Sequence, residues 1–268
     1  MAGSPRVLVL RAAGINCDEE TAAAAALAGG RPERIHVNRL VGGECNLLDY
    51  AALIIPGGFS YGDHLGAGKL LAVDLIHRLR EPLQRFVADG RPVLGICNGF
   101  QVLVKAGLLP GSAAGETPPA APRQTVTLTG NRNGHYECRW VNLIADPESP
   151  CIFTRGLDRL FSLPVGHGEG RLEADDAILD QLEVRRQVAV RYADVHGAPT
   201  QAYPQNPNGS ARAVAGLCSS DGTVFGLMPH PDRAYRPQLH PDWLRTRERQ
   251  EGDGLAIFRN MVRYTQEL

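Results

Sequence analysis

The feature that most constrains the fold of this chain is the stretch from Arg91 to Gln101, where a short apolar run meets a cysteine flanked by glycines. Gly95, Cys97 and Gly99 have the spacing of a sharp strand-to-helix turn, in which small neighbours let a strained backbone lift a nucleophile clear of its own main chain. The partial positive charge at the helix N-terminus favours thiolate over thiol. The alternative is a buried cysteine that only packs. We therefore expect a strand, a nucleophile elbow and a helix, in that order.

A partner base for this cysteine comes near the C-terminus. The stretch from Thr223 to Arg233 reads as a buried strand that ends in His230, Pro231 and Asp232. Residues two apart in an extended segment point the same way, and the proline stiffens the link. A lone histidine is more often structural, but one paired with a carboxylate in a chain with an elbow cysteine favours catalysis. We expect Cys97 to be the nucleophile, His230 the proton acceptor and donor, and Asp232 the group that orients the imidazole.

A glycine pair follows the apolar run that begins at Leu53. The backbone of Gly57 and Gly58 is unobstructed, and the N–H groups of Gly58 and Asn98 could stabilise the oxyanion of a tetrahedral intermediate. Glycines after a strand are also ordinary turn formers, so this loop gains its meaning from the two features above.

Strand-like and helix-like segments alternate in the first part of the chain. We expect strands at 7–10, 34–37, 52–55 and 93–96, and helices at 19–28, 69–78 and 82–88. This pattern predicts an α/β fold with an open, mostly parallel twisted sheet covered by helices on both faces. After a predicted loop at 111–123, additional antiparallel strands are expected at 124–129, 138–144, 187–192, 213–218 and 224–228, followed by an amphipathic helix at 254–266.

Composition sets further limits. A chain of 268 residues with 43% hydrophobic and 21% charged residues can form one domain, predicted here to span 1–268. The net charge of −1 gives no general attraction to nucleic acid or to anionic membranes. Six scattered cysteines without a Cys-x-x-Cys pair argue against a metal site and favour reduced thiols in the cytoplasm. No secretory segment or membrane span is expected.

Three other signals do not support a function. The run from Gly66 to Lys69 lacks the first glycine of a phosphate loop, and Leu70 replaces its Ser or Thr. Asn208 begins a glycosylation sequon that we interpret as a turn. The charged stretch from Arg233 to Asp253 is interpreted as a solvated surface element, in which Trp243 could pack or contact a partner.

Taken together, the stretches around Cys97, Gly57 and His230 resemble those of class I glutamine amidotransferases. Within that class the chain is similar to the glutaminase subunit of phosphoribosylformylglycinamidine synthase. The further similar stretches cover most of the chain and are residues 11–18, 133–141, 166–171, 191–192 and 206–210.

The resemblance implies a flavodoxin-like fold and a definite reaction. Cys97 would attack the carboxamide of glutamine, and ammonia would pass to a synthetase subunit that aminates formylglycinamide ribonucleotide with ATP and Mg²⁺, while a small third subunit assists assembly. It also implies that Gln101 helps to hold glutamine, although Gln101 could equally be a solvated neighbour. His167 and Glu169 are implied to lie in a loop at the edge of the site or at the subunit contact.

One residue departs from the family pattern, which has Glu where this chain has Asp232. Because Asp is one methylene shorter, reaching the imidazole requires a backbone shift or a bridging water. We expect such compensation. The alternatives are a catalytically impaired structural subunit of the same complex, a related amidotransferase that serves another amination, and a different cysteine hydrolase on a similar sheet.

Overall fold

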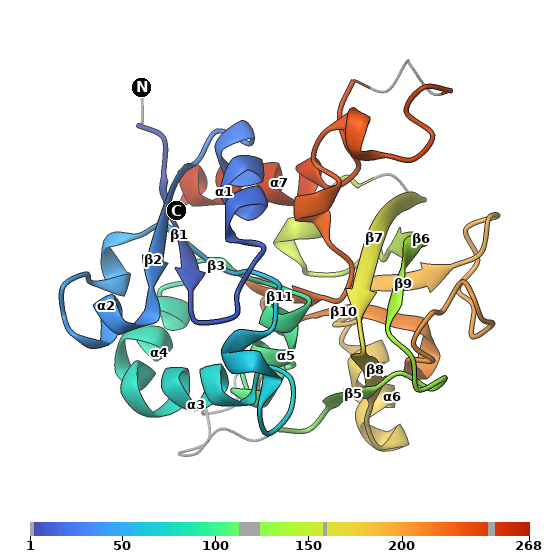
Figure 1. The fold of residues 1–268 in the computed structure, drawn as a ribbon, viewed down its shortest axis with the longest axis horizontal. Helices are drawn as coiled ribbons and strands as arrows, with labels where there is room; N and C mark the ends of the chain where they lie inside the picture. Colours follow the sequence, from blue (N-terminus) through green and yellow to red (C-terminus); the bar gives the residue numbers. More distant parts are fainter. Residues whose placement is uncertain (1–2, 113–123, 158–159, 246–249) are drawn as a thin grey trace.

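The computed structural model describes residues 3–112, 124–157, 160–245 and 250–268. Within these ranges nine strands form one sheet in the order β2-β1-β3-β4-β11-β10-β9-β6-β7, and β5 and β8 form a separate antiparallel pair (Figure 1). The strands are β1 (Arg6–Arg11), β2 (Arg31–His36), β3 (Ala52–Ile55), β4 (Val93–Ile96), β5 (Thr127–Gly130), β6 (Glu137–Ala145), β7 (Phe161–His167), β8 (Glu169–Glu173), β9 (Val190–Ala193), β10 (Val214–Cys218) and β11 (Val224–Leu227). The helices are α1 (Asp18–Leu27), α2 (Val37–Val41), α3 (Lys69–Arg78), α4 (Arg80–Ala88), α5 (Asn98–Lys105), α6 (Asp176–Val184) and α7 (Leu255–Glu267).

One half of the large sheet is parallel. Strands β2, β1, β3, β4 and β11 all run in the same direction. Every residue of β3, β4 and β11 is buried, as expected for strands covered on both faces. Helices α1 and α7 pack together on one side of this half, and α3, α4 and α5 lie on the other (Figure 1). The predicted sheet between two layers of helices is confirmed.

The other half of the sheet is antiparallel, as the sequence predicts for the C-terminal part. Strand β11 pairs with β10, and β10, β9, β6 and β7 follow with alternating direction. Buried and half-buried residues alternate along β7, which is typical of a strand with one face on the core. The seam between the two halves is therefore the strand β11, which precedes His230.

Several predicted bounds need correction. Strand β3, strand β4 and helix α3 have the predicted bounds, but the strand expected at 34–37 is displaced. Strand β2 ends at His36, whose ring nitrogen accepts the Asn38 N–H at 3.2 Å and caps α2. Val37 thus begins a helix rather than ending a strand, because a capping side chain outweighs the β propensity of valine.

Strands β7 and β8 and helix α6 were not expected from the sequence. The stretch 166–171 was expected to be a loop, yet it forms the end of β7, a turn at Gly168 and most of β8. Pro164 and Gly166 are poor strand residues that an edge strand tolerates, and β7 is one of the two edge strands of the sheet. The loop predicted at 111–123 lies, from residue 113 on, outside the described residues.

The C-terminal helix has the predicted apolar face. Its buried residues include Leu255, Ile257, Phe258, Met261 and Val262. Asn260 shares this face, and its amide donates to the backbone carbonyls of Phe153 and Arg155 at 2.9 and 2.8 Å. At 13 residues α7 is well below the ~20 needed to cross a bilayer, and no other helix in the described ranges is long and apolar enough to do so.

The closeness of α5 to β3 gives a stability test. A Cβ added to Gly99 would lie 1.9 Å from the carbonyl oxygen of Ile55, so the helix and strand would have to separate. In an exposed helix Gly→Ala is stabilising, but here we expect Gly99→Ala to lower the free energy of unfolding by about 3 kcal/mol.

The matched control is Gly130→Ala, because nothing lies within 4 Å of a Cβ at that position. Urea denaturation should show a change within about 0.5 kcal/mol for the control. Equal effects of the two substitutions would contradict the packing described here.

Candidate active site

Cys97 lies at the junction of β4 and α5 with φ 50° and ψ −104°. Such a conformation costs about 1–3 kcal/mol in a non-glycine residue and persists only where its surroundings impose it. Its N–H donates to the Leu227 carbonyl of β11 at 2.8 Å, and its carbonyl accepts the Gln101 N–H at 3.1 Å. A Cβ on Gly95 would lie 2.5 Å from the Leu103 side chain, so the glycine is required. The predicted strand, sharp turn and helix are confirmed.

The Cys97 thiol is enclosed. Only 5% of the residue is exposed, and its Sγ donates a hydrogen bond to the Gly166 carbonyl of β7 at 3.6 Å. Tyr136 lies beside Gly166, because its hydroxyl oxygen is 3.1 Å from the position that a Cβ on Gly166 would occupy. The end of β7 and Tyr136 therefore limit access to the sulfur in this conformation.

His230 and Asp232 form a buried pair. The backbone N–H of His230 donates to the Pro164 carbonyl at 2.8 Å, and the ring Nδ1 of His230 lies 3.1 Å from Oδ1 of Asp232. The expectation of an extended segment is wrong, because Pro231–Arg233 form a 3-10 turn, η5. With the backbone in this turn, the Asp232 carboxylate reaches the ring directly.

The electrostatics of the site centre on the imidazole. Burial lowers the pKa of His230, but the charges of Asp232 and Cys97 together with the carboxylate hydrogen bond outweigh burial and raise the pKa well above 6.5. The Cys97 thiol donates to the Gly166 carbonyl and makes no hydrogen bond to His230 within the described residues, so the direct contact of sulfur and imidazole stays a prediction. The Asp232 carboxylate therefore favours the imidazolium form of His230.

The glycine pair after β3 lies against the imidazole. A Cβ on Gly57 would lie 2.6 Å from Cε1 of His230, so only glycine leaves room for the ring. Gly58 has φ 139°, a region that favours glycine. Two backbone hydrogen bonds hold the loop. The Cys17 N–H donates to the Gly57 carbonyl at 3.3 Å, and the Phe59 N–H donates to the carbonyl of Gly14, in the loop after β1, at 2.9 Å. Neither bond uses the Gly58 N–H.

Asn98 and Gln101 tie the elbow helix to its surroundings. The Asn98 side chain accepts the Ser60 N–H at 3.1 Å and donates to Asp63 at 3.0 Å and to Gln101 at 2.9 Å. Its backbone N–H belongs to the first turn of α5, where helices leave N–H groups free of internal bonds. Gln101 is 4% exposed, so it is not a solvated neighbour, and its amide donates to the Glu169 backbone carbonyl.

His167 lies inside a buried polar network. Its Nδ1 is 3.1 Å from Oδ1 of Asn131, and its Nε2 is 3.5 Å from Nδ2 of Asn208. Burial, followed by the charge of His230, lowers the pKa of His167 to about 3, so the ring is neutral at physiological pH. Glu169 is half-buried, and its carboxylate accepts the Ala67 N–H at 3.2 Å. Both residues brace the strand end that meets Cys97.

Sequence reasoning assigned no role to several residues that the structure brings to the site. Thr21 donates its hydroxyl to Oδ2 of Asp232 at 3.2 Å, and the Cys17 sulfur lies beside the same pair. Asn208, interpreted as a turn residue, is fully buried, and its amide donates to Tyr192 at 3.0 Å. Cys17 and Asn208 lie in stretches singled out by resemblance and Thr21 does not, and no local pattern around the three residues indicates a contact with distant segments.

Cys17, His230 and Asp232 offer potential metal-ligand atoms that lie within 4.8 Å of one another. Arg233 argues against a metal, because its guanidinium donates to the Cys17 sulfur at 3.0 Å and places a positive charge there. Burial also raises the pKa of the Cys17 thiol, which disfavours the thiolate that metals bind. The donor set of this cluster therefore does not favour a metal ion.

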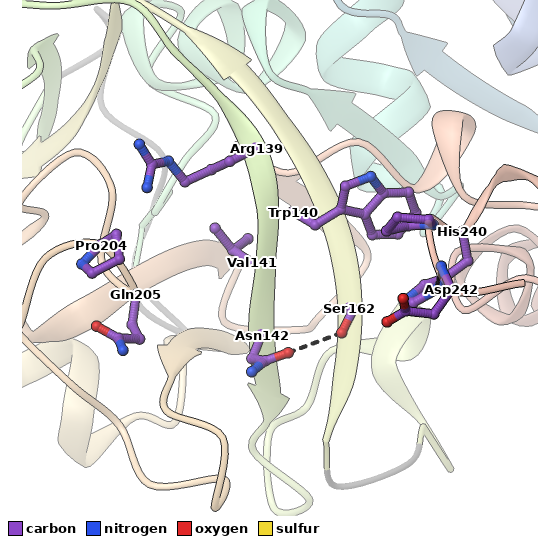
Figure 2. A pocket seen from close by; sticks show the side chains of 10 residues that line it. Arg139, Trp140, Val141, Asn142, Ser162, Pro204, Gln205, His240 and Asp242 are labelled. Carbon is purple, nitrogen blue, oxygen red and sulfur yellow. Dashed lines mark hydrogen bonds between the residues drawn. The ribbon is translucent and has the colours of Figure 1, made fainter. Parts of the chain in front are cut away.

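A separate hollow of about 320 Å³ lies on the antiparallel half of the sheet (Figure 2). His240 contacts the Trp140 ring edge-on there, with ring centroids 4.8 Å apart. Part of the stretch predicted as a solvated surface element is thus packed, while Trp243 is 42% exposed. Ser162 in this hollow lies within the regular strand β7 and donates its hydroxyl to Oδ1 of Asn142 at 2.9 Å, so the strained turn at Cys97 is the better candidate for the chemistry.

The neutral His167 makes stability depend on pH. Between pH 6.5 and about 3 the His167 ring binds a proton in the unfolded chain but not in the folded chain. As the pH decreases through this range, His167 therefore lowers the free energy of unfolding by about 1.4 kcal/mol per pH unit. His230, whose pKa is raised, has the opposite effect on the free energy of unfolding, and it is present in the wild type and in the variant described next.

We therefore compare the wild type with His167→Gln by urea denaturation from pH 7.5 to 4.5. The stability difference should narrow as the pH falls below about 6.5, whereas the difference from the exposed control His196→Gln should stay constant. A constant gap for His167→Gln would mean that this ring is protonated in the folded protein.

Comparison with known proteins agrees with this geometry. Residues 4–265 match the family model of the CobB/CobQ-like glutamine amidotransferase domain. The chain is 43% identical over 98% of both lengths to the phosphoribosylformylglycinamidine synthase subunit PurQ of Dehalococcoides mccartyi, and 46% identical, over 85% of this chain and 87% of the relative, to that of Treponema denticola. A chain of the PurLQS structure from Thermotoga maritima superimposes with a TM-score of 0.71 at 30% identity, covering 97% of this chain and 99% of that one. The chain therefore belongs to the family of PurQ subunits, within the CobB/CobQ-like glutamine amidotransferases.

Proposed function

We propose that this chain is the glutaminase subunit of a phosphoribosylformylglycinamidine synthase. It hydrolyses glutamine to glutamate and ammonia and delivers the ammonia for the amination of formylglycinamide ribonucleotide in purine biosynthesis. The observation that carries the proposal is that the strained Cys97 is hydrogen-bonded to the end of β11, the strand that leads to the buried His230 and Asp232 pair, in a chain of the PurQ family.

The geometry supports a two-step acyl transfer. The Cys97 sulfur attacks the carboxamide carbon, and the N–H groups of Gly58 and Asn98 stabilise the oxyanion. The His230 imidazolium gives its proton to the departing ammonia, which leaves a glutamyl thioester. The imidazole then takes a proton from water as the water attacks the thioester, which releases glutamate and restores the thiol. Asp232 orients the ring and stabilises its charged form.

The partner supplies the rest of the reaction. The relatives are named as subunits of a synthase, and a similar chain occurs in the PurLQS structure. We place ATP and Mg²⁺ on the synthetase subunit, since the run from Gly66 to Lys69 lacks the residues of a phosphate loop. A small third subunit completes the assembly. The free cysteines of this chain suit the reducing cytoplasm, where we propose that the complex acts.

The enclosed thiol supports control by the partner. Cys97 is only 5% exposed and its thiol is bonded to Gly166, so we infer that the end of β7 moves when glutamine binds. We therefore expect the isolated chain to hydrolyse glutamine slowly and the complex to hydrolyse it faster.

Replacement of the nucleophile separates the two half-reactions. Cys97→Ser in the assembled complex should lower glutamine-dependent synthesis by at least about 10³-fold and change ammonia-dependent synthesis by less than about twofold. Steady-state assays with either nitrogen donor check this. Equal loss of both activities would contradict the proposal, as would full glutamine use by the variant.

The orienting role of Asp232 predicts a change in the pH profile. The raised pKa of His230 depends on the carboxylate charge, so Asp232→Asn should lower that pKa. Activity that requires the imidazolium is lost as pH rises through the pKa, so the alkaline limb of kcat/KM for glutamine should move to lower pH. An unmoved limb would show that another group sets the charge of the ring.

A further inference from the structure

The first turn of α1 lies against the catalytic pair, although it is remote from that pair in sequence. Cys17 is the N-cap of α1, and Thr21 follows one helical turn later, with its N–H donating to the Cys17 carbonyl at 3.1 Å. Both residues are almost completely buried. Side chains at this spacing share one face of a helix, so they meet neighbouring parts of the same target.

Thr21 completes the hydrogen bonds of the carboxylate. Oδ1 of Asp232 contacts Nδ1 of His230 at 3.1 Å, and Oδ2 accepts the Thr21 hydroxyl at 3.2 Å. With a partner on each oxygen, the carboxyl plane has one favoured orientation. This constraint matters because the side chain is short and lies in a 3-10 turn.

Cys17 borders the imidazole. The Cys17 sulfur and His230 Cε1 both lie against Gly57, at 3.2 and 2.6 Å from the position of an added Cβ. The thiol donates to Oδ1 of Asn16 at 3.3 Å and accepts from Arg233 at 3.0 Å. Because burial keeps this thiol neutral, the sulfur separates the Arg233 guanidinium from the imidazolium without adding a charge.

Ion pairs fix the position of this turn. Asp18, the residue after Cys17, pairs with Arg11 of β1 at 2.9 Å and with Arg34 of β2 at 3.1 Å. Glu20 pairs with Arg233 of η5 at 3.3 Å. The turn is therefore tied both to the sheet and to the segment that carries the catalytic pair.

We propose that the first turn of α1 is a positioning element of the active site, in which Cys17 holds the imidazole of His230 in place and Thr21 fixes the carboxylate of Asp232. Neither residue touches the substrate. The inference rests on the proposed glutaminase function and extends it to residues that act through the catalytic pair.

The test uses the assembled complex with Thr21→Val, Thr21→Ser, Cys17→Ala and Cys17→Ser. Matched controls are Thr223→Val, a buried threonine whose hydroxyl has no partner within the described part of the chain, and Cys151→Ala, a buried cysteine in the core. Measurements are kcat and KM for glutamine, the pH profile, ammonia-dependent synthesis and the melting temperature.

We expect Thr21→Val and Cys17→Ala to lower kcat for glutamine about tenfold with KM within about twofold, and to move the alkaline limb down by at least about half a pH unit. Thr21→Ser and Cys17→Ser should restore most of kcat and the limb. The groups that face the ring and set this limb are Asp232, Cys97, Cys17, His167 and Tyr136, with Arg233 behind the Cys17 sulfur.

The proposal is overturned if Thr21→Val and Cys17→Ala keep the wild-type kcat for glutamine and the wild-type alkaline limb of the pH profile. It is also overturned if, at equal melting temperature, their kcat and alkaline limb equal those of Thr223→Val and Cys151→Ala. If Cys17→Ala does not fold, the nearly isosteric Thr21→Val decides. Failure of the function itself is recognised separately, because Cys97→Ser would then retain glutamine-dependent synthesis. Loss of ammonia-dependent synthesis in the position 21 variants would indicate a structural defect and would also overturn the proposal.

Discussion

The candidate site depends on the parallel pairing of β4 with β11. In this register Ile96 lies opposite Leu227, and the N–H of Cys97 donates to the Leu227 carbonyl. The bond forces the chain to turn at Cys97 and sets the distance from the elbow to His230, which follows β11. A slip of one residue would turn the strand side chains to the other face of the sheet and separate sulfur from imidazole. The backbone pairing of β4 with β11 therefore determines where Cys97 and His230 begin.

The second constraint is the burial of polar groups around that seam. His230 and Asp232 are both enclosed, and buried polar groups are costly unless each has a partner. The partners come from separate parts of the chain: Thr21 on the carboxylate, the Pro164 carbonyl on the His230 N–H, and Cys17 beside the ring. Burial and charge oppose each other at the imidazole, and charge prevails, whereas burial prevails at the neighbouring His167. The pKa values of the two histidines are thereby shifted in opposite directions.

Local sequence patterns were enough to predict most of the parallel half of the fold and the elbow, but β11, expected among the antiparallel strands, pairs parallel with β4. Strands β3 and β4 are short apolar runs bounded by glycine or proline, and such runs leave little choice of structure. Strand β7 was missed because Pro164 and Gly166 weaken the strand pattern, and its edge position is decided by tertiary pairing. Likewise the turn at Pro231–Arg233 and the contact of Thr21 with Asp232 depend on how α1 packs, which no local spacing encodes. Long-range partners of a site are therefore the part that the sequence alone conceals.

The most direct measurement is covalent capture of the nucleophile by a glutamine analogue that carries a diazoketone, followed by peptide mass spectrometry of the complex. The account predicts one adduct, on Cys97, with the other five cysteines unmodified, and no adduct in a Cys97→Ala variant. Modification of Cys17 in place of Cys97, or an unmodified chain in a complex that still uses glutamine, would contradict it.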